Sequence, residues 1–423
     1  MWNVIQRRVS LIREPNEVRI LRLVRDRGEI SRIEIAKATT LHKATITDLV
    51  SKLIRAGFLE ETGEVEIRKR VGRKRILLRF RPQAALVIGV DIRMAHAMVA
   101  LTDLNAHILR QESFHYAIDA TPKEVLTHVA TTIHALLGAT ELSPSKLVGI
   151  GIGVQGVIDY PTNTLVLSQN KKQWQGESLS ADLESQFNVP VYVENDVKTM
   201  ALGEYLLGSA KGTKDFVHIW VGDGVGAGIM INGRLLHGIT SSAGEIGFNG
   251  LEFSSFYEEK FPLTYRGQIM FGEILNDANF VESYRRATHQ SDQVELTVSS
   301  IAEKANEGDR TAKEVIEEFA SLLSILCINM VNTLNPAIII IGGKLAQSYP
   351  KIAMMLQERI HRDLLAAPAE AVKVRPAMHG ESGVILGAAG LVLYELFEPV
   401  HSFSVRSSRR KIVSEIRQAT NSM

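Results

Sequence analysis

Residues 84–116 read AALVIGVDIRMAHAMVALTDLNAHILRQESFHY. Short apolar runs alternate there with turn residues such as Asp103, Leu104 and Asn105, and this pattern predicts three antiparallel strands. A similar set of runs recurs at 216–221, 226–231 and 234–236. The repetition predicts a duplicated body of two α/β halves.

The rest of this body predicts alternating helices and strands. Helices are expected at 122–137, 196–207, 311–334 and 383–397, and strands at 147–154, 189–194 and 337–341. Ligands of such folds bind where strand ends and turns converge. Cys327 is predicted to be a core residue, and His218 is predicted to be a core or edge residue whose hydrogen bonds are satisfied.

The segment in front of the body, residues 1–82, predicts a winged helix-turn-helix. Helices are expected at 16–27, 31–38 and 42–56, because apolar residues recur there at helical spacing. Ser31 and Glu34 have the spacing of a capping box. The very short link between the second and third helices is typical of a helix-turn-helix, and strands at 64–69 and 75–80 complete the wing.

Cationic and hydroxyl side chains lie where such a domain meets DNA. The apolar stripe of the third helix faces inward, so its polar side chains are expected to face a major groove. The contacts predicted on this helix are His42, Lys43, Thr45, Thr47 and Lys52. The contacts predicted at the wing, suited to a minor groove, are Arg70, Arg73, Lys74 and Arg75. The alternatives are a solvated helix face for each single residue, and a basic linker or an RNA-binding patch for the wing.

The charge of the chain is unevenly distributed. The whole chain has 48 Lys and Arg against 47 Asp and Glu. Residues 1–82 hold 20 of these cations against 10 of the anions, and the remaining residues hold 28 against 37. A basic head on an acidic body is expected when one part binds a polyanion and the other part does something else.

The composition excludes several classes of protein. The chain is 45% hydrophobic and 22% charged, which is ordinary for a globular protein. Its single cysteine excludes an internal disulfide framework and a multi-thiolate metal site. No apolar signal-peptide core is visible at the amino terminus, and apolar runs are far shorter than the ~20 residues of a membrane span. We therefore expect a cytoplasmic protein with no membrane partner.

Three motifs of the body resemble those of the ROK family, which comprises repressors, open reading frames and kinases. The motifs are E-N-D at 194–196, G-D-G-V-G-A-G at 222–228 and A-G-E-I-G at 243–247. The resemblance implies a sugar-binding α/β body with the ribonuclease-H-like actin/hexokinase duplicated fold, preceded by the winged helix-turn-helix of the family's repressor branch. It implies a DNA-binding domain over 1–82, a body over 83–400 and a basic tail over 401–423.

The resemblance also implies which residues bind a sugar. In ROK kinases the aspartate of the first motif deprotonates the sugar hydroxyl, so Asp196 is a vestigial base here. Asn195, Gly244 and Glu245 match sugar-binding motif positions, and Asn170 matches more loosely the start of the family's N-x-x-x-W segment. The alternatives are a helix N-cap for Asn195 or Asp196, and a surface loop for Asn170.

Both phosphate loops depart from the family pattern. The first is D-x-G-x-T in the family, whereas residues 91–95 read DIRMA, with Arg93 in place of glycine. The second has Asp223 where the family has Thr or Ser, and a carboxylate about 4 Å from a phosphate costs roughly 1 to 4 kcal/mol. Residues 342–344, GGK, resemble the family's nucleotide-base loop or serve as an ordinary turn. We therefore expect no kinase activity. Because the Arg93 side chain can bind an anion, a phosphorylated sugar remains an alternative effector.

The zinc loop of the family is also missing. Family members usually follow A-G-E-I-G with histidine and then with C-x-C-G-x-x-G-C. This chain has Phe248 at the histidine position, and residues 249–275 contain neither cysteine nor histidine. Zinc of that kind has no ligands here, so neither a metal nor a cofactor is expected. Phe248 either offers an apolar face to a ligand or fills space.

The predicted function is that of a sugar-responsive, DNA-binding transcriptional repressor. We expect a homodimer or homotetramer on double-stranded operator DNA. A small sugar is expected to close a cleft between Asn195 and Asp196 on one side and Glu245 on the other, and thereby to rotate one half of the body against the other. The rivals are an ATP-dependent sugar kinase with a DNA-binding head, and a DNA-binding protein whose body serves only dimerisation.

Overall fold

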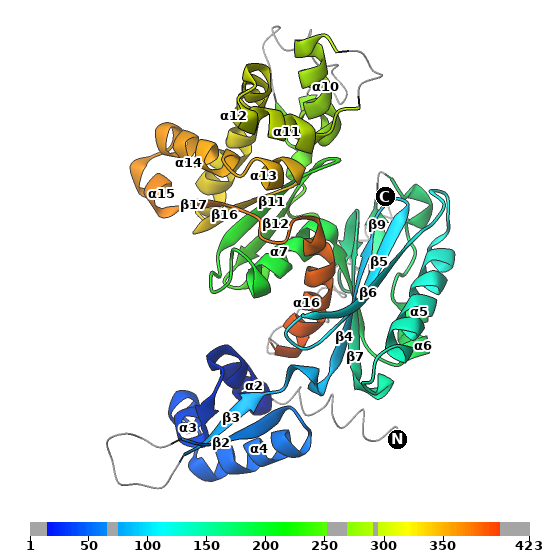
Figure 1. The fold of residues 1–423 in the computed structure, drawn as a ribbon, viewed down its shortest axis with the longest axis vertical. Helices are drawn as coiled ribbons and strands as arrows, with labels where there is room; N and C mark the ends of the chain where they lie inside the picture. Colours follow the sequence, from blue (N-terminus) through cyan, green and yellow to red (C-terminus); the bar gives the residue numbers. More distant parts are fainter. Residues whose placement is uncertain (1–14, 66–74, 169, 252–268, 291–294, 398–423) are drawn as a thin grey trace, which may run out of the picture. The chain divides into compact units, whose positions relative to one another are not determined.

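The computed structural model describes residues 15–65, 75–168, 170–251, 269–290 and 295–397 (Figure 1). They form two compact units. Unit 1 consists of the chain up to Ile152, Asp159–Val193 and the chain from Ala388 on, and unit 2 consists of Gly153–Ile158 and Glu194–Gly387. The predicted wing contacts Arg70, Arg73 and Lys74, the side chain of Arg75 and the tail 401–423 lie outside the described residues. The predicted domain boundaries stay predictions.

The amino-terminal head of unit 1 is a winged helix-turn-helix. Its helices are α2 (Pro15–Arg27), α3 (Arg32–Thr39) and α4 (Lys43–Arg55). Its sheet has the order β1-β3-β2, with β1 at Ile30–Ser31, β3 at Arg75–Phe80 and β2 at Leu59–Val65. The structure confirms the predicted class, but β2 begins before the predicted strand and β1 was not predicted.

Local sequence signals explain where these helices begin and end. Ser31 and Glu34 form the predicted capping box at the start of α3. Gly28 has φ 77° after α2, a conformation that glycine adopts without a steric penalty. The apolar stripe of α4 is buried, and its fully or largely covered members are Ile46, Leu49, Val50 and Leu53.

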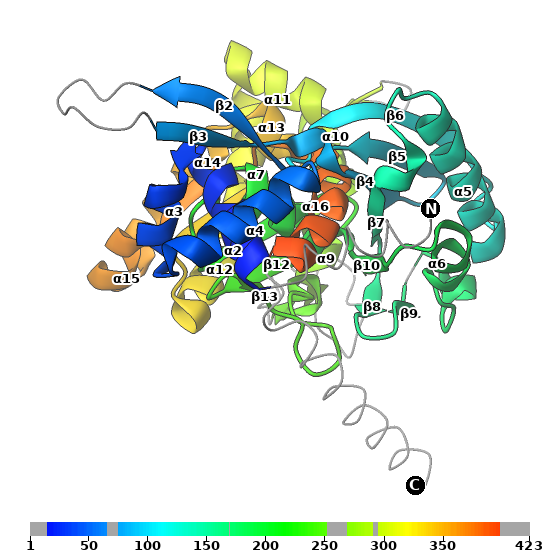
Figure 2. The same ribbon diagram turned by 90° about the horizontal axis from the view of Figure 1, so that it is seen from below.

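The larger sheet of unit 1 has the order β10-β7-β4-β5-β6. Its strands are β4 (Leu86–Ile92), β5 (His96–Thr102), β6 (Ile108–His115), β7 (Leu147–Val154) and β10 (Val191–Asn195). The first three form the predicted antiparallel meander. Helix α5 (Pro122–Gly138) contacts β5 and β6, and α6 (Ala181–Phe187) lies beside α5 (Figure 2). A two-stranded sheet of β8 (Val157–Asp159) and β9 (Thr164–Leu167) was not predicted.

Unit 2 has a second five-stranded sheet, in the order β13-β12-β11-β16-β17. Its strands are β11 (Phe216–Val221), β12 (Val225–Ile231), β13 (Arg234–Leu235), β16 (Ile338–Gly342) and β17 (Lys373–Pro376). Strands β11, β12 and β13 are antiparallel neighbours, which confirms the second meander, and β16 joins β11 in parallel. The short strands β14 (Gly250–Leu251) and β15 (Ile269–Met270) pair separately.

Most helices of unit 2 gather over one face of this sheet. The helices are α7 (Asp196–Leu207), α9 (Phe271–Ile274), α10 (Asp277–Thr288), α11 (Val298–Glu307), α12 (Arg310–Leu334), α13 (Lys344–Ser348), α14 (Ile352–Asp363) and α15 (Ala366–Ala371). Apolar residues of β11 and β16 share one core with α10, α11, α12 and α14. Cys327 is fully buried there, as predicted. Helix α7 contacts β11 and β12 instead, over Phe216, Met230 and Ile340.

The last described helix, α16 (Gly383–Phe397), takes part in both units. In unit 1 its final residue contacts the head: the Arg25 guanidinium lies 4.5 Å from the Phe397 ring centre, and the Phe80 ring lies edge-on at 6.3 Å. Among the described residues, only Gly380–Phe397 is long and apolar enough to cross a membrane. It is 72% buried inside the protein, which is typical of a core helix.

Candidate functional site

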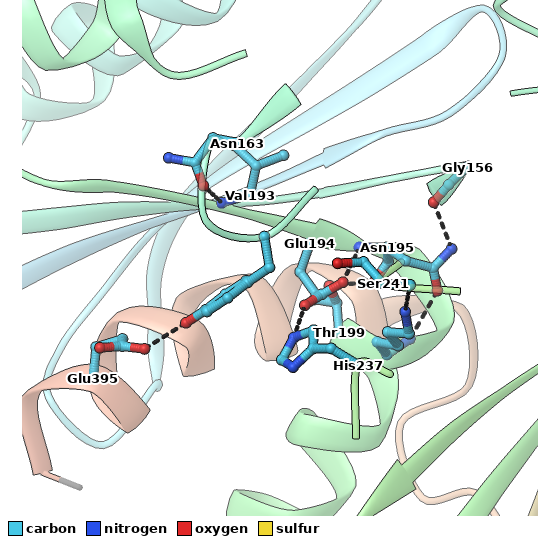
Figure 3. Close-up of polar contacts among 11 residues, drawn as sticks. Gly156, Asn163, Val193, Glu194, Asn195, Thr199, His237, Ser241 and Glu395 are labelled. Carbon is cyan, nitrogen blue, oxygen red and sulfur yellow. Dashed lines mark hydrogen bonds and ion pairs between the residues drawn. The ribbon is translucent and has the colours of Figure 1, made fainter. Parts of the chain in front are cut away.

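The predicted sugar residues Asn195 and Asp196 lie where β10 runs into α7. The Asn195 side chain caps this helix, because its Oδ1 accepts a hydrogen bond from Lys198 N at 3.0 Å. Its Nδ2 donates to Gly156 O at 3.0 Å (Figure 3) and, also at 3.0 Å, to Asp196 Oδ1. The alternative predicted for Asn195, a helix N-cap, is therefore present in the structure, and the cap fixes the orientation of its amide.

Asp196 is the first residue of α7 and is half-buried. Its Oδ1 also accepts a hydrogen bond from Val197 N at 2.9 Å. The start of a helix carries a partial positive charge, which favours an ionised carboxylate at this position. Asp196 is thus a positioned carboxylate at a strand end, suited to accept a hydrogen bond from a hydroxyl group.

Glu245 lies on a loop that is held against β12. The preceding residue, Gly244, has φ 95°, and its carbonyl accepts a hydrogen bond from Ala227 N at 2.8 Å. A Cβ atom at position 244 would lie 1.9 Å from Ala227 O, so only glycine fits. Burial raises the pKa of the half-buried Glu245 carboxyl, and the nearby Lys198 ammonium partly opposes this rise.

Two ionisable residues that were not among the predicted sugar contacts, Glu194 and His237, form a pair next to Asn195. Glu194 is fully buried, and its Oε2 lies 2.6 Å from His237 Nε2. Its other oxygen accepts a hydrogen bond from Asn195 N at 2.8 Å. Burial opposes ionisation of Glu194, but His237, Lys198 and the Asn195 amide together hold its pKa below the usual value. Figure 3 shows the Glu194 carboxylate and the His237 ring facing each other.

Lys198 completes this group of buried polar residues. Only 1% of its surface is exposed, and its Nζ donates to the carbonyl of Ser241. Ser241 is itself buried and has φ 62°, which is unusual for a residue other than glycine. Lys198 and Ser241 were also missed, because nothing in the linear sequence brings position 198 close to position 241.

The predicted sugar residues fall into two groups. Asn195, Asp196, Gly244 and Glu245 all belong to unit 2. Both carboxylates lie in the same unit, so the predicted cleft between them does not separate the two units, and the predicted rotation of one half of the body against the other stays a prediction. Asn170 belongs to unit 1, where it lies exposed in a bend after β9.

The first phosphate-loop position in unit 1 is occupied by an ion pair. Arg93 Nε lies 2.9 Å from Asp91 Oδ2, and the Tyr116 hydroxyl donates to the Arg93 carbonyl. Lys171 is buried beside them: its Nζ donates to Tyr116 Oη at 2.8 Å and to Met94 O at 3.2 Å. Arg93 thus pairs with Asp91 at the position where the family pattern has a glycine.

The second phosphate-loop position in unit 2 is acidic. Asp277 N donates to Gly222 O at 2.8 Å, and the Asp277 carboxylate pairs with Lys344 at 3.2 Å, which brings the GGK turn beside the glycine loop. Burial raises the pKa of Asp277, Lys344 opposes the rise, and the carboxylates of Asp223 and Glu381 add to it. Lys344 therefore faces several carboxylates at once.

The DNA-contact residues predicted on α4 lie on the solvent-exposed side of the helix. His42, Lys43, Thr45, Thr47 and Lys52 are all exposed. His42 is the N-cap residue but makes no capping hydrogen bond through its side chain. The Thr47 hydroxyl donates to Lys43 O at 2.9 Å, so it is engaged within the helix.

The region of the missing zinc motif is only partly described. Phe248 is 51% exposed, so its ring offers an apolar face instead of filling the core. Residues 252–268 lie outside the described chain. In the ranges that the structure covers, no three His, Cys, Asp or Glu side chains gather as metal ligands.

The fold and the site together define the class of the protein. A winged helix-turn-helix precedes two α/β units that each begin with a strand meander, with glycine loops and polar residues at strand ends. This is the architecture of a DNA-binding head on a sugar-kinase-like body. Sequence comparison agrees: the ROK family model matches residues 87–395, and the MarR family model matches residues 14–64. The chain belongs to the ROK family.

Individual relatives support the same arrangement. The xylose repressor of Caldicellulosiruptor bescii is 28% identical over 400 residues, which cover 92% of this chain and 97% of that protein. A solved ROK family transcriptional regulator, a homologue of the Escherichia coli Mlc protein, has a TM-score of 0.76 at 22% identity and covers 92% of this chain and 100% of its own. A ROK family glucokinase from Streptomyces griseus, solved with glucose and AMPPNP, has a TM-score of 0.60 at 21% identity. It covers 73% of this chain and 99% of its own.

Proposed function

We propose that this protein is a DNA-binding transcriptional repressor that responds to a small sugar. The observation that carries the proposal is the alignment with the xylose repressor over 97% of that protein, since it includes the head as well as the body. The kinase fold alone is shared by enzymes, but the glucokinase covers only 73% of this chain. We further propose a homodimer or homotetramer that acts in the cytoplasm.

The head is the proposed DNA-binding surface. Helix α4 presents His42, Lys43, Thr45, Thr47 and Lys52 to solvent, and its apolar side faces the core of the head. By the sequence, Arg70, Arg73, Lys74 and Arg75 form the wing that accompanies this helix. Exposed lysines suit phosphate contacts, and the hydroxyl of Thr45 suits a base edge or a phosphate.

Unit 2 carries the proposed sugar-binding edge. Asp196 and Glu245 are half-buried carboxylates, and Asn195 and Gly244 hold the backbone beside them. Carboxylates of this kind accept hydrogen bonds from sugar hydroxyls. Asn170, on a different unit, is a proposed further contact with the sugar.

We propose that the protein is not an enzyme. Asp196 retains the position of the base, but both phosphate-loop positions are altered. Arg93 pairs with Asp91 at the first, and Asp223 adds a carboxylate to the surroundings of Asp277 and Lys344 at the second. Each change disfavours a bound nucleotide, because it removes hydroxyl donors or adds negative charge near the phosphates.

Helix α16 is the proposed route from sugar to DNA. In unit 2 its Gly387 packs directly on Thr199 of α7, the helix that begins at Asp196. In unit 1 its Phe397 contacts Arg25 of the head. A sugar that shifts α7 would shift α16 as well, and a ten- to hundred-fold effect on DNA affinity corresponds to about 1.4 to 2.7 kcal/mol of coupling.

DNA binding can be tested by removing the exposed lysines of α4. Operator fragments are first selected from genomic DNA, and their binding is then measured against salt concentration. We expect Lys43→Ala and Lys52→Ala each to weaken binding and to reduce the slope of log K against log salt by about 0.9 for each lost phosphate contact. Lys313→Ala, an equally exposed lysine on α12, is the control. Unchanged affinity and slope in both α4 variants would remove α4 from the interface.

Sugar binding can be tested with a thermal-shift screen of neutral and phosphorylated sugars. A sugar at 100 times its Kd is expected to stabilise the protein by about 2.7 kcal/mol. Asp196→Asn and Glu245→Gln keep the side-chain shapes and should each abolish the shift, whereas Glu303→Gln on α11 should not. The same sugar should alter operator affinity. A screen without any response would favour the rival in which the body serves only dimerisation.

A further inference from the structure

The loop that carries Glu245 is tied to the start of α7 at two points. We infer that Lys198 and His237 are positioning residues that clamp the loop 237–248, here called the AGEIG loop, onto α7, so that Glu245 and Asp196 form a single sugar-binding edge. The inference rests on the proposed function for the identity of the ligand. The clamp itself rests on contacts within unit 2.

The first point of the clamp is the pair of His237 and Glu194. His237 is the first residue of the AGEIG loop, and its Nε2 lies 2.6 Å from the Glu194 carboxylate. Glu194 immediately precedes Asn195 and accepts a hydrogen bond from its backbone amide. The imidazole therefore contacts the same carboxylate that orients the N-cap of α7 (Figure 3).

The second point is the hydrogen bond from Lys198 to the carbonyl of Ser241. Both residues are buried, at 1% and 2% exposure, so water does not compete for this contact. Ser241 has φ 62°, a conformation that costs roughly 1 kcal/mol in a residue with a side chain. A buried cation that bonds the carbonyl of a strained residue holds the loop where its local preference would not place it.

The charges of the site depend on the same lysine. Burial acts to raise the pKa of both Glu194 and Glu245, and the Lys198 ammonium opposes this effect at each carboxyl. Loss of the ammonium would leave two poorly solvated carboxylates without this compensation. Repulsion and the need for water would then drive the AGEIG loop away from α7. The clamp thus links the position of Glu245 to that of Asp196.

The clamp also accounts for a loop without metal ligands. Residues 249–275 have neither cysteine nor histidine, so no thiolate or imidazole in that stretch can anchor the loop to a zinc ion. Side chains of β10, α7 and the loop itself supply the anchoring instead. The position of the AGEIG loop then depends on Glu194, Lys198 and His237. Each of these residues can be substituted separately.

The experiment compares four variants of the full-length protein. Lys198→Met removes the ammonium but keeps most of the stem, and His237→Phe removes the ring donor. His237→Gln keeps an N–H donor and tests rescue. Lys146→Met is the matched control, because Lys146 also donates to a backbone carbonyl, that of Gln83 in unit 1, at 3.0 Å. Amide hydrogen exchange of the AGEIG loop is measured without sugar, and sugar affinity is measured separately.

We expect Lys198→Met and His237→Phe each to speed exchange in the AGEIG loop and to weaken sugar binding by about tenfold or more. His237→Gln should recover most of both properties, and Lys146→Met should change neither.

The outcomes separate the clamp from the proposed function. Unchanged loop exchange in both variants would overturn the clamp, whatever the sugar does. Faster loop exchange with unchanged sugar affinity would also overturn the clamp, since Lys198 and His237 would then support the fold without positioning Glu245 for the sugar. If the wild type binds no sugar, the proposed function fails while the exchange data still decide whether the clamp exists. If Lys198→Met does not fold, the double variant Lys198→Met/Ser241→Gly relieves the strain at 241 and takes its place.

Discussion

Some buried polar side chains of unit 2 have hydrogen-bond partners, and others do not. The Glu204 carboxylate accepts hydrogen bonds from the backbone amides of Ser209, Met378 and His379 at 2.6, 2.9 and 3.2 Å. His218, on the central strand β11, is 1% exposed, and neither ring nitrogen has a hydrogen-bond partner among the described residues. The prediction that its ring is satisfied is wrong, because the side chain is buried where the described residues offer neither ring nitrogen a polar partner.

At this scale, His218 predicts a pH dependence of stability. Burial lowers its pKa from 6.5 to about 4, and the Glu204 carboxylate only partly opposes this. Between these values the unfolded chain binds a proton that the folded chain does not. Stability should therefore fall as the pH drops from about 6.5 to about 4, by up to about 3 kcal/mol from this residue alone.

The measurement is urea unfolding of wild type and His218→Leu at several pH values. The leucine variant should lose that part of the pH dependence and gain relative stability toward pH 4. His361→Asn, at an exposed histidine, should leave the pH profile as it is. Parallel profiles for wild type and His218→Leu would show that His218 does not stay neutral in the folded protein.

Close contacts between helices depend on glycine. Helix α7 approaches α16 so closely that a Cβ atom at Gly387 would lie 1.8 Å from Thr199 O, and one at Gly203 would lie 3.2 Å from Gly383 O. Small residues at these positions let two backbones touch. The apolar α16 sequence, GVILGAAGLVLYELF, predicts a buried helix but does not show which glycine faces which neighbour.

At the scale of elements, Gly387→Ala is expected to destabilise the protein by about 1 to 3 kcal/mol, because the methyl group forces α16 away from α7. Gly138→Ala is the matched control. Gly138 ends α5 with no atom within 4 Å of its would-be Cβ, so alanine there should be neutral or stabilising by up to about 1 kcal/mol. Denaturant unfolding gives both values. Equal effects of the two substitutions would contradict the close packing of α16 on α7.

The whole molecule combines a basic head with an acidic body, and the body belongs to the ROK family. Around the glycine loop of unit 2, Lys344 faces Asp223, Asp277 and Glu381. We expect the carboxylates of this site to repel the phosphates of ATP. The negative charge suits a body that does not compete with the head for DNA.

At this scale, we expect no sugar-dependent formation of ADP when the purified protein is mixed with ATP, magnesium and a panel of sugars. The physical reason is the added carboxylate of Asp223 together with the Arg93–Asp91 pair at the other loop position. A functional sugar kinase serves as the positive control for the assay. ADP formation that requires sugar and disappears in Asp196→Asn would establish the rival kinase function.

Several features of the site were predictable because they are local. Asn195 as an N-cap follows from an amide at the start of an apolar helix, and the positive φ of Gly244 agrees with the glycine of its motif. The resemblance to the ROK family supplied Asp196 and Glu245. His237 and Lys198 were not found, because their partners lie 43 residues away along the chain in each case.

The amino-acid sequence alone was enough to predict the two meanders, the winged helix-turn-helix and the family. These follow from hydrophobic periodicity, turn residues and motifs, which act over short stretches of chain. The folded structure was needed to see that Asp196 and Glu245 belong to one compact unit and that Glu194, Lys198 and His237 join them. The physical reason is that buried charges need partners, and folding selects those partners by proximity in space and not by position in the chain.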